Sequence, residues 1–155
     1  MDIYKAQTLA HKLMEQHGLI YKRGLHDVPP WSFVWDRAKR RHGQCRYSRK
    51  QISLSRPLTR LLSEDEVRDT ILHEIAHALI GPGHGHGPEW KEQARAIGCN
   101  ASRGYSGGIH VPKKWRGTCP NCKRSFLYHR RRALSCKHCF LHVKGLHAFI
   151  YTRNS

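Results

Sequence analysis

Two histidines and one glutamate, His73, Glu74 and His77, form an HExxH pattern. On a helix, residues four apart lie on one face, so the two imidazoles can bind the same metal ion while Glu74 projects beside it. Zinc accepts nitrogen ligands, and a catalytic zinc has three protein ligands and keeps one position for water. The pattern therefore predicts a zinc site that needs one more ligand.

The third ligand is expected from the segment that follows, GPGHGHGP, at positions 81–88. Its glycines and prolines allow the chain to turn back toward the helix, and it offers His84 and His86. We favour His86, because the adjoining Gly87 and Pro88 begin another helix and fix its direction. His84 stands between two unconstrained glycines and is the alternative.

A zinc ion in such a site polarises a water molecule and a carbonyl group, and Glu74 can carry protons as general base and general acid. This chemistry is typical of peptide-bond hydrolysis. Two simpler interpretations stay open: histidines satisfied by ordinary hydrogen bonds, and a purely structural metal site. Neither explains Glu74, because a carboxylate on an apolar helix face is costly to bury without a metal or a proton.

Other polar residues near the motif have weaker assignments. Asp69, one turn before His73, either orients that ring or, as we favour, is a solvated acid near the helix start. No residue can be assigned to assist the oxyanion, since Arg103, Tyr105 and His110 merely follow the site in sequence.

Four of the six cysteines form a second pattern, two CxxC pairs separated by thirteen residues: Cys119, Cys122, Cys136 and Cys139. Each pair can act as a knuckle on one tetrahedral zinc, which predicts a structural zinc ribbon. A thioredoxin-like redox role fits less well, because it needs a single CxxC at a helix start.

The remaining cysteines and the nearby histidines are secondary candidates. His129 and His138 lie among the four cysteines and His142 lies just after them, but four thiols already complete a structural site. Cys45 and Cys99 are expected to be small buried apolar residues.

The chain is strongly basic, and the charge is unevenly distributed. The formal net charge is +17; positions 1–100 hold 16 Lys and Arg against 11 Asp and Glu, whereas positions 101–155 hold 12 and no acid. A solubilising surface is the simpler explanation, but an acid-free run of this length exceeds what solubility requires. Because Lys and Arg release counterions when they contact phosphates, we expect a nucleic-acid partner.

The segment between the cysteine pairs, KRSFLYHRRRALS, interleaves basic and aromatic side chains. Basic groups follow phosphates and aromatic rings stack on unpaired bases, so this hairpin suits single-stranded or distorted DNA without sequence specificity. Packing within the small ribbon explains the two aromatic residues equally well. A second basic stretch holds nine Lys and Arg between Arg37 and Arg60 and no acid. The candidate DNA contacts are Lys123, Arg124, Phe126, Tyr128, Arg130, Arg131 and Arg132.

The positions before the HExxH motif predict a helix and a sheet. Apolar side chains recur at three- and four-residue spacing over positions 2–17 and end at Gly18, which is typical of an amphipathic helix. The runs WSFVW, GQCRYS and QISLS, within positions 31–55, predict three strands of a small antiparallel sheet. No run is long and apolar enough for a membrane span or a secretory signal, so we expect a cytoplasmic protein.

Two further helices are expected around the site. Ser63 and Glu66 form a capping box, which places the HExxH motif on a helix from about position 64 to 80. Pro88 suits the first turn of another helix that ends near Gly98. After a linker at about 99–112, the cysteine module follows. The sequence thus predicts an α+β protein with a core at 1–111 and a ribbon at 112–155.

The chain resembles the SprT-like metalloproteases over nearly its whole length. The resemblance is carried by ILHEIAHAL with its loop and HGPEW, by the preceding WSFVWDRAKRRHGQCRYSRKQISLSRPL and by the four-cysteine ribbon. The resemblance implies a small zincin-like core, His73, His77 and His86 as zinc ligands, and Glu74 as catalytic acid and base. It also makes Trp90 a packing residue. The short loop before His86 is typical of a compact member, without the partner-recruiting tail of the eukaryotic relatives.

Those relatives, the Spartan proteases, cleave proteins covalently trapped on DNA and are activated by DNA. The resemblance therefore implies a monomeric, DNA-stimulated zinc endopeptidase of DNA repair, with one catalytic and one structural Zn²⁺, that acts on DNA-bound or crosslinked proteins and associates with the nucleoid. Two alternatives stay open. One is a DNA-binding zinc protein whose protease fold is inactive, and the other is a metallopeptidase that cleaves one regulatory protein.

Overall fold

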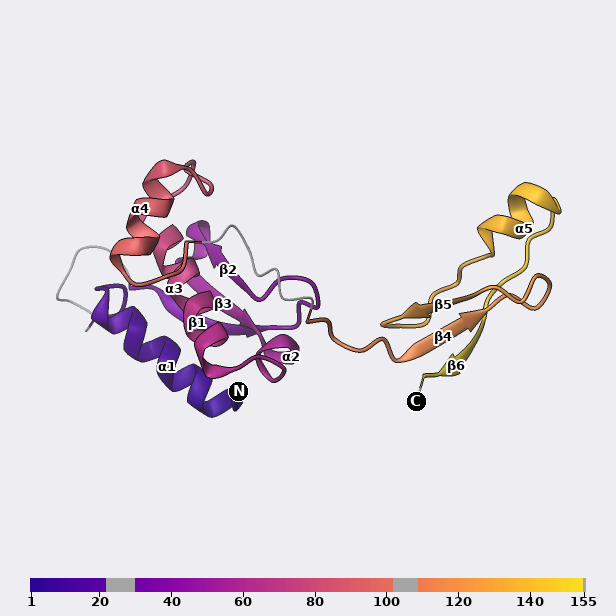
Figure 1. The fold of residues 1–155 in the computed structure, drawn as a ribbon, viewed down its shortest axis with the longest axis horizontal. Coiled ribbons are helices and arrows are strands. Elements are labelled where there is room, and N and C mark those ends of the chain that lie inside the picture. Colours follow the sequence, from indigo (N-terminus) through magenta and orange to yellow (C-terminus); the bar gives the residue numbers. More distant parts are fainter. Residues whose placement is uncertain (22–29, 102–108, 155) are drawn as a thin grey trace. The chain divides into compact units, whose positions relative to one another are not determined.

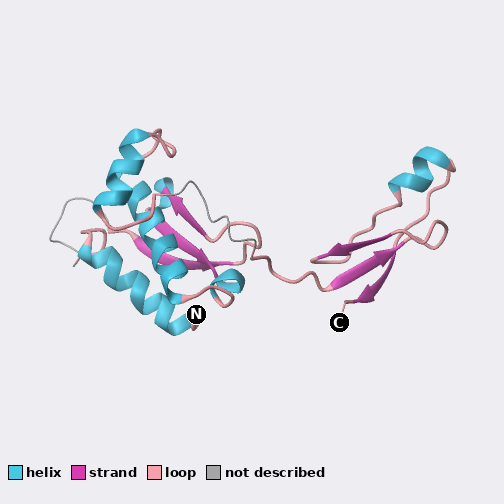
Figure 2. Cartoon of the chain, viewed as in Figure 1, coloured by secondary structure: helices cyan, strands magenta, loops and turns pink. Residues whose placement is uncertain are grey.

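A computed structural model describes residues 1–21, 30–101 and 109–154 of the chain. The chain divides into two compact units, Met1–Val111 and Pro112–Ser155 (Figure 1). In the described residues, the first unit combines several helices with a three-stranded sheet, and the second combines one short helix with another three-stranded sheet and contains a four-cysteine cluster (Figure 2). The predicted α+β class with a C-terminal cysteine ribbon is confirmed.

The first unit opens with helix α1, Ile3–Gln16, in the place where the apolar spacing predicted it. The carboxylate of Asp2 caps its start by accepting hydrogen bonds from the backbone N–H groups of Tyr4 and Lys5, at 2.9 and 3.1 Å. Gly18 follows the helix with a φ of +70°, a conformation that glycine adopts without strain. The buried face of α1 consists of Ile3, Ala6, Ala10, Leu13 and Met14.

The three expected strands form one sheet, but its topology differs from the expectation. Strands β1 (Ser32–Asp36), β2 (Gly43–Arg46) and β3 (Gln51–Ser55) lie in the order β1-β3-β2. Strand β2 is antiparallel to β3, whereas β1 runs parallel to it, so the prediction of a wholly antiparallel sheet was wrong. The reason is that the short connection at 37–42 crosses the end of β3 instead of turning back beside β1.

Ser55, at the end of β3, holds this connection in place. Its backbone N–H donates to the carbonyl of His42 at 2.7 Å, and its hydroxyl donates to the carbonyl of Ala38 at 2.6 Å. The same hydroxyl accepts from the N–H of Leu58 at 3.2 Å and so caps the short helix α2, Arg56–Thr59. One fully buried side chain therefore joins the connection, the sheet and α2.

Helices α3, Glu64–Ile80, and α4, Pro88–Ala96, confirm the two helices expected around the motif. The capping box between Ser63 and Glu66 is complete, and α3 ends at Gly81, whose φ is +81°. Helices α1 and α3 pack against each other and against the sheet, and α4 packs on α3 (Figure 1). The core between them contains Leu13, Ile52, Leu54, Ile71, Leu72, Ile75 and Trp90.

The second unit is a small cysteine ribbon. Strand β4, Trp115–Thr118, is the centre of a sheet in which β5, Ser125–Tyr128, and β6, Ile150–Arg153, are both antiparallel to it. A short helix that the sequence patterns did not predict, α5, Lys137–His142, follows the second cysteine pair. Within the described part of the chain, no helix combines the length and the apolar character that a membrane span needs.

Replacing Ser55 by alanine should lower the free energy of unfolding of the first unit by about 2 kcal/mol, because it leaves the carbonyl of Ala38 and the N–H of Leu58 without their buried partner. Urea denaturation followed by circular dichroism measures the change. The exposed Ser48 is the matched control, and Ser48→Ala should alter stability by no more than about 0.5 kcal/mol. Equal effects of the two substitutions would contradict the role assigned to Ser55.

Candidate metal centres

Helix α3 presents the HExxH residues within a largely apolar surface. Val67, Ile71, Leu72, Ile75 and Ala76 are buried on its faces, which fixes the rotation of the helix. His73 and His77 are then one turn apart on the side that faces α4, and Glu74 is turned toward the sheet, where only 7% of it is exposed. The packing of the helix thus sets the direction of each polar side chain.

Three imidazole nitrogens converge at the end of α3. The Nε2 atom of His86 lies 2.9 Å from Nε2 of His73 and 3.2 Å from Nε2 of His77. A zinc ion bound tetrahedrally to nitrogens at 2.0–2.1 Å requires nitrogen atoms about 3.3 Å apart, so the three side chains fit one zinc ion. Their ligand atoms all lie within 4.8 Å of one another, and the residues can hold a metal.

His86 comes from the Gly-rich segment between α3 and α4, at positions 81–87. Gly81, Gly83 and Gly85 have positive φ angles of 81°, 99° and 55°, which lets the segment turn back over the end of α3. His86, and not His84, is brought to the other two histidines. His84 is exposed instead and lies 4.0 Å from the carboxylate of Glu89.

Trp90 of α4 supports all three rings. Its centroid lies 4.6 Å from that of His73, 4.6 Å from that of His86 and 5.2 Å from that of His77, against which it stacks at 28°. Trp90 is fully buried, so its indole fixes the imidazoles from one side and keeps water away. The packing role expected of this residue is consistent with these contacts.

Burial determines the protonation of the histidines. It lowers the pKa of His73 to about 4, with the neighbouring His77 and His86 adding to the effect. Burial and His86 also lower the pKa of His77 to about 4. Both imidazoles are therefore neutral at pH 7, which is the form that binds a metal.

Strand β2 holds the carboxylate of Glu74. The backbone N–H of Cys45 donates a hydrogen bond to it, and Gly43 lies so close that an added Cβ atom would be 2.8 Å from both Cγ and Oε1 of Glu74. A side chain at position 43 would displace the carboxylate. Neither contact is among those predicted from the sequence, although a glycine at the start of a strand can signal such a close approach.

Burial raises the pKa of Glu74 to about 7. The Cys45 N–H and the positive charge of Arg41 oppose this shift, and the charge of Asp36 adds to it. Arg41 and Asp36 form an ion pair at 2.7 Å, so their charges largely offset each other at Glu74. A carboxyl group with a pKa near neutrality is suited to accept and return a proton.

The four predicted cysteines also converge. The Sγ atoms of Cys119 and Cys139 are 3.6 Å apart and those of Cys122 and Cys136 are 3.5 Å apart. These distances exclude disulfides, whose S–S length is about 2.05 Å, and approach the spacing of about 3.8 Å around a tetrahedral zinc with Zn–S bonds of 2.3 Å. Together the four residues form a second group that can hold a metal.

Backbone groups assist ionisation of Cys119 in this cluster. Burial opposes ionisation of Cys119, but N–H groups of Cys122 and Asn121 outweigh it and lower the pKa of the thiol to about 7. The side-chain amide of Asn121 also lies 3.5 Å from Sγ of Cys139. Donors aimed at sulfur stabilise thiolates, the form that binds zinc.

The model of the SprT-like family matches residues 10–116 of the chain. The chain belongs to the SprT-like family. The matched range contains the three histidines, Glu74 and strand β2, and it ends before the first of the four ribbon cysteines. This assigns a metallopeptidase-like domain to the first unit. A comparison with curated proteins gives no match.

Other candidate residues of this SprT-like domain are placed differently from the expectation or lie outside the described residues. The carboxylate of Asp69 accepts from the N–H of Asn100 at 2.8 Å, so it fixes the segment after α4 and is not simply solvated. His110 is exposed. Arg103 and Tyr105 fall outside the described residues. Cys99 is buried as expected, whereas Cys45 is only partly buried.

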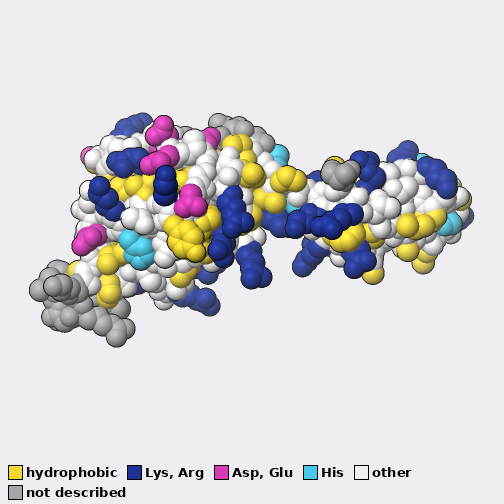
Figure 3. Space-filling view, turned by 90° about the horizontal axis from the view of Figure 1, so that it is seen from below, with side chains coloured by type: hydrophobic (Ala, Val, Ile, Leu, Met, Phe, Trp, Pro, Cys, Tyr) yellow, Lys and Arg dark blue, Asp and Glu magenta, His cyan; other side chains and the backbone are white. Residues whose placement is uncertain are grey.

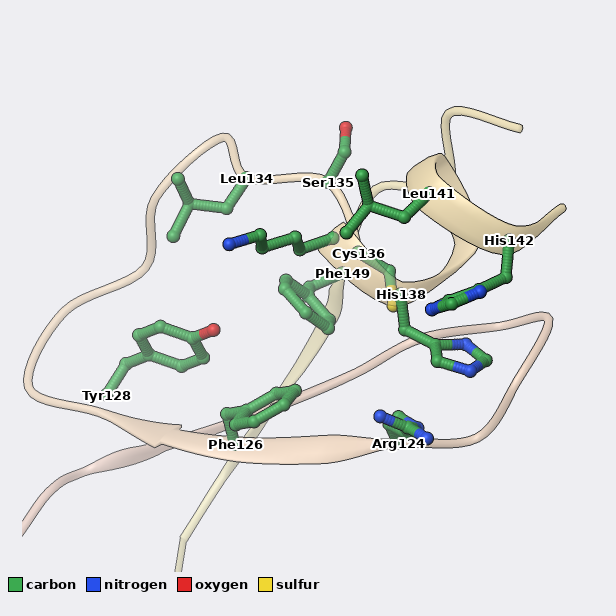
Figure 4. A pocket seen from close by; sticks show the side chains of 11 residues that line it. Arg124, Phe126, Tyr128, Leu134, Ser135, Cys136, His138, Leu141, His142 and Phe149 are labelled. Carbon is green, nitrogen blue, oxygen red and sulfur yellow. The ribbon is translucent and has the colours of Figure 1, made fainter. Parts of the chain in front are cut away.

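The ribbon of the SprT-like protein contains a cavity of about 490 Å³ beside the cysteine cluster (Figure 4). Phe126 and Tyr128 of β5 line it together with Phe149, and Arg124, Lys137 and His138 bring positive or polar groups to it. Phe126 is 51% exposed while its ring contacts Phe149, with the centroids 5.8 Å apart. Packing and an accessible aromatic face, which were alternatives from the sequence, are thus combined in one residue.

The cavity gathers only part of the predicted DNA contacts. Arg124, Phe126 and Tyr128 line it, but Lys123 and the three consecutive arginines do not. The ammonium group of Lys123 donates to the carbonyl of Pro120 at 2.7 Å, and the guanidinium of Arg131 lies 4.8 Å from the centroid of the Trp115 ring. Arg130 and Arg132 are exposed.

In the metal-free protein, Glu74→Gln should raise stability at high pH and leave it nearly unchanged at low pH. The folded pKa of about 7 exceeds the ordinary value of 4.5, so the folded state of the wild type binds the proton more tightly and loses stability as pH rises from 4.5 through 7. Above pH 7 the variant should gain up to about 3 kcal/mol. Thermal unfolding at 222 nm with chelator, at pH 5 and pH 8.5, measures this. A difference that does not change with pH would contradict it.

Proposed function

We propose that this SprT-like protein is a zinc-dependent endopeptidase that cleaves proteins bound or crosslinked to DNA. The observation that carries the hydrolytic part is the convergence of three imidazoles, of which those of His73 and His77 are neutral at pH 7, together with the buried carboxyl group of Glu74, next to His73 in the chain, whose pKa is near 7. A purely structural metal site would not need Glu74, whose burial lowers stability. The nucleic-acid part is supported by the acid-free basic composition of positions 101–155 and by the aromatic cavity of the ribbon.

His73, His77 and His86 would hold the catalytic zinc, which supplies Lewis-acid activation of water and of the scissile carbonyl when it is bound. The Oε atoms of Glu74 take the proton of the attacking water and return it to the nitrogen of the leaving amine. The Cys45 N–H and the missing side chain at Gly43 keep that carboxylate in one position. Trp90 excludes water from the side of the rings that it covers.

The ribbon would provide the contact with DNA. Its four cysteines would hold the structural zinc and thereby fix the hairpin that carries β5 and the cavity. An unpaired base can stack on Phe126, while Arg124 and Lys137 at the same cavity attract the flanking phosphates. A base within a regular duplex cannot enter such a cavity, which favours single-stranded or distorted DNA.

Glu74→Gln should abolish cleavage of a protein crosslinked to single-stranded DNA, with a loss of at least about 100-fold, because the general base is removed while the metal ligands are kept. Electrophoresis of the crosslinked substrate measures cleavage, and atomic spectroscopy measures zinc. The wild type should contain two zinc ions per chain, and the variant should retain both.

The exposed Glu92 of α4 provides a control, since Glu92→Gln removes the same charge away from the histidines and should leave cleavage unchanged. Unchanged cleavage in Glu74→Gln would exclude the peptidase mechanism. A wild type that binds DNA and both metals but cleaves no protein would select the alternative of an inactive protease fold.

Phe126→Ala should weaken binding of a single-stranded oligonucleotide by 1–3 kcal/mol, roughly 5- to 150-fold, because stacking on one base is lost. Fluorescence anisotropy at fixed salt measures the affinity. Leu127→Ala is the matched control, since Leu127 is a neighbouring exposed residue of β5 that does not line the cavity. Equal affinities of the two variants for the oligonucleotide would contradict base stacking in the cavity.

A further inference from the structure

A second group of basic residues lies on the first unit, at the end of the sheet where the connection at 37–42 crosses β3. Ala38 and His42 of the connection are both hydrogen-bonded to Ser55, and Arg56 follows Ser55 directly. Arg37, Lys39, Arg40 and Arg56 are therefore brought to one corner of the unit, which we call the corner surface. Seen from below, Lys and Arg side chains gather on this unit (Figure 3).

The charges of the corner surface are not neutralised within the described parts of the chain. Arg37, Arg40 and Arg56 are exposed and Lys39 is half-buried, and none of the four forms an ion pair with a described acid. The nearest acid in sequence, Asp36, is already occupied. Its carboxylate accepts from the N–H of Ala38, from Arg41 and from the hydroxyl of Ser53, at 2.8, 2.7 and 2.9 Å.

The corner surface is continuous with the strand that holds Glu74. The connection at 37–42 leads directly into β2, where Gly43 and Cys45 contact the Glu74 carboxylate. Arg41, between the corner surface and β2, is close enough to Glu74 to affect its charge. Any polyanion bound to the connection would consequently lie near the residues that carry the proposed hydrolysis.

We propose that the corner surface binds the phosphate backbone of single-stranded DNA, so that the protease unit itself contacts the DNA that carries its substrate. This inference rests on the proposed function and adds a DNA contact that does not depend on the ribbon. Three of the four residues are arginines, whose planar guanidinium groups bind phosphate oxygens through two parallel hydrogen bonds. A chain of phosphates matches four neighbouring cations without demanding a base sequence.

An anionic membrane is the other polyanion that such a surface fits. DNA is favoured because the ribbon of the same chain combines basic side chains with an accessible aromatic cavity, a combination suited to unpaired bases. Vesicles therefore serve as the competing ligand in the test.

The test compares the triple variant Arg37→Gln, Arg40→Gln, Arg56→Gln with the wild-type full chain in its zinc-bound form. Binding of a labelled oligothymidylate is measured by anisotropy between 50 and 300 mM salt. Three lost phosphate contacts should reduce the steepness of log affinity against log salt by about 2, since each contact on a single strand contributes about 0.7. The affinity at 0.1 M salt should fall at least roughly tenfold.

Two matched variants separate charge from position and from folding. The triple variant Arg49→Gln, Lys91→Gln, Arg95→Gln removes the same charge from exposed residues elsewhere on the unit and should keep most of the salt dependence. The triple variant Arg37→Lys, Arg40→Lys, Arg56→Lys keeps the charge and should restore the wild-type salt dependence. Equal salt dependence in the Gln variant of the corner surface and in the wild type would overturn the proposal. The proposal would also be overturned if the Gln variant of the corner surface lost binding to phosphatidylserine vesicles while its binding to DNA stayed unchanged.

The binding measurement also separates this proposal from the proposed function. If the wild type cleaves no protein, the peptidase proposal is refuted. If the corner variant nevertheless binds DNA with a weaker salt dependence than the wild type, the corner surface is retained as a DNA contact. If the wild type and the corner variant cleave a DNA-crosslinked protein equally and bind DNA equally, the corner surface is refuted as a DNA contact and the peptidase proposal is retained. Combining the corner variant with Phe126→Ala should multiply the two losses of affinity, as expected for separate contacts.

Discussion

Three half-buried histidines that converge beside helix α3 impose the main constraint on the first unit. The Nε2 atom of His86 lies within hydrogen-bonding distance of Nε2 of both His73 and His77. Neutral imidazoles cannot make both contacts as hydrogen bonds, because the Nε2 atom of His86 has either one hydrogen to donate or one lone pair to accept with. A divalent cation satisfies all three lone pairs at once. The stability of the unit and the occupancy of this site are therefore linked, because metal binding to the folded state stabilises it.

The arrangement of the sheet follows from the need to hold Glu74 on the same helix. Its carboxylate requires a hydrogen-bond donor and a neighbour without a side chain, and Cys45 and Gly43 of β2 supply them. Strand β2 is an edge strand in the order β1-β3-β2, and it packs against α3 together with the central strand β3. The parallel pairing of β1 with β3 is the consequence, since the chain must cross the end of β3 to reach that edge. Ser55 stabilises the crossing.

Local signals in the sequence were sufficient for the helices and for the metal-binding groups. Apolar spacing was enough to predict α1, and the capping box at Ser63 with Gly81 after the last turn was enough to predict α3. Helix formation depends mainly on residues that are close in sequence, so short patterns record it. The HExxH spacing and the paired cysteines indicated the two clusters for the same reason. The choice of His86 over His84 rested on the helix start at Gly87 and Pro88, which fixes the direction of His86, and the structure brings His86 to the other rings.

Features that depend on distant pairing could not be obtained in this way. Strand order and direction depend on which edge packs against α3, and no pattern within WSFVW or QISLS records that choice. The contacts of Glu74 with β2 join residues about 30 positions apart, and the partner of Asp69, the N–H of Asn100, is a backbone group that any residue but proline offers. Helix α5 was missed because its six residues lack an apolar period and depend on the cysteine cluster at Cys136 and Cys139.

The two metal-binding groups differ in a way that bears on their roles. Four thiols complete a tetrahedral zinc and leave no position for a substrate, whereas three imidazoles leave one position open. A buried carboxyl group near a fully coordinated structural zinc would only lower stability. The cysteine unit has no such group, because positions 101–155 contain no Asp or Glu. The one buried acid of the described chain, Glu74, instead follows His73 of the open group directly on α3. The distribution of acids therefore supports chemistry at the histidines and a structural function at the cysteines.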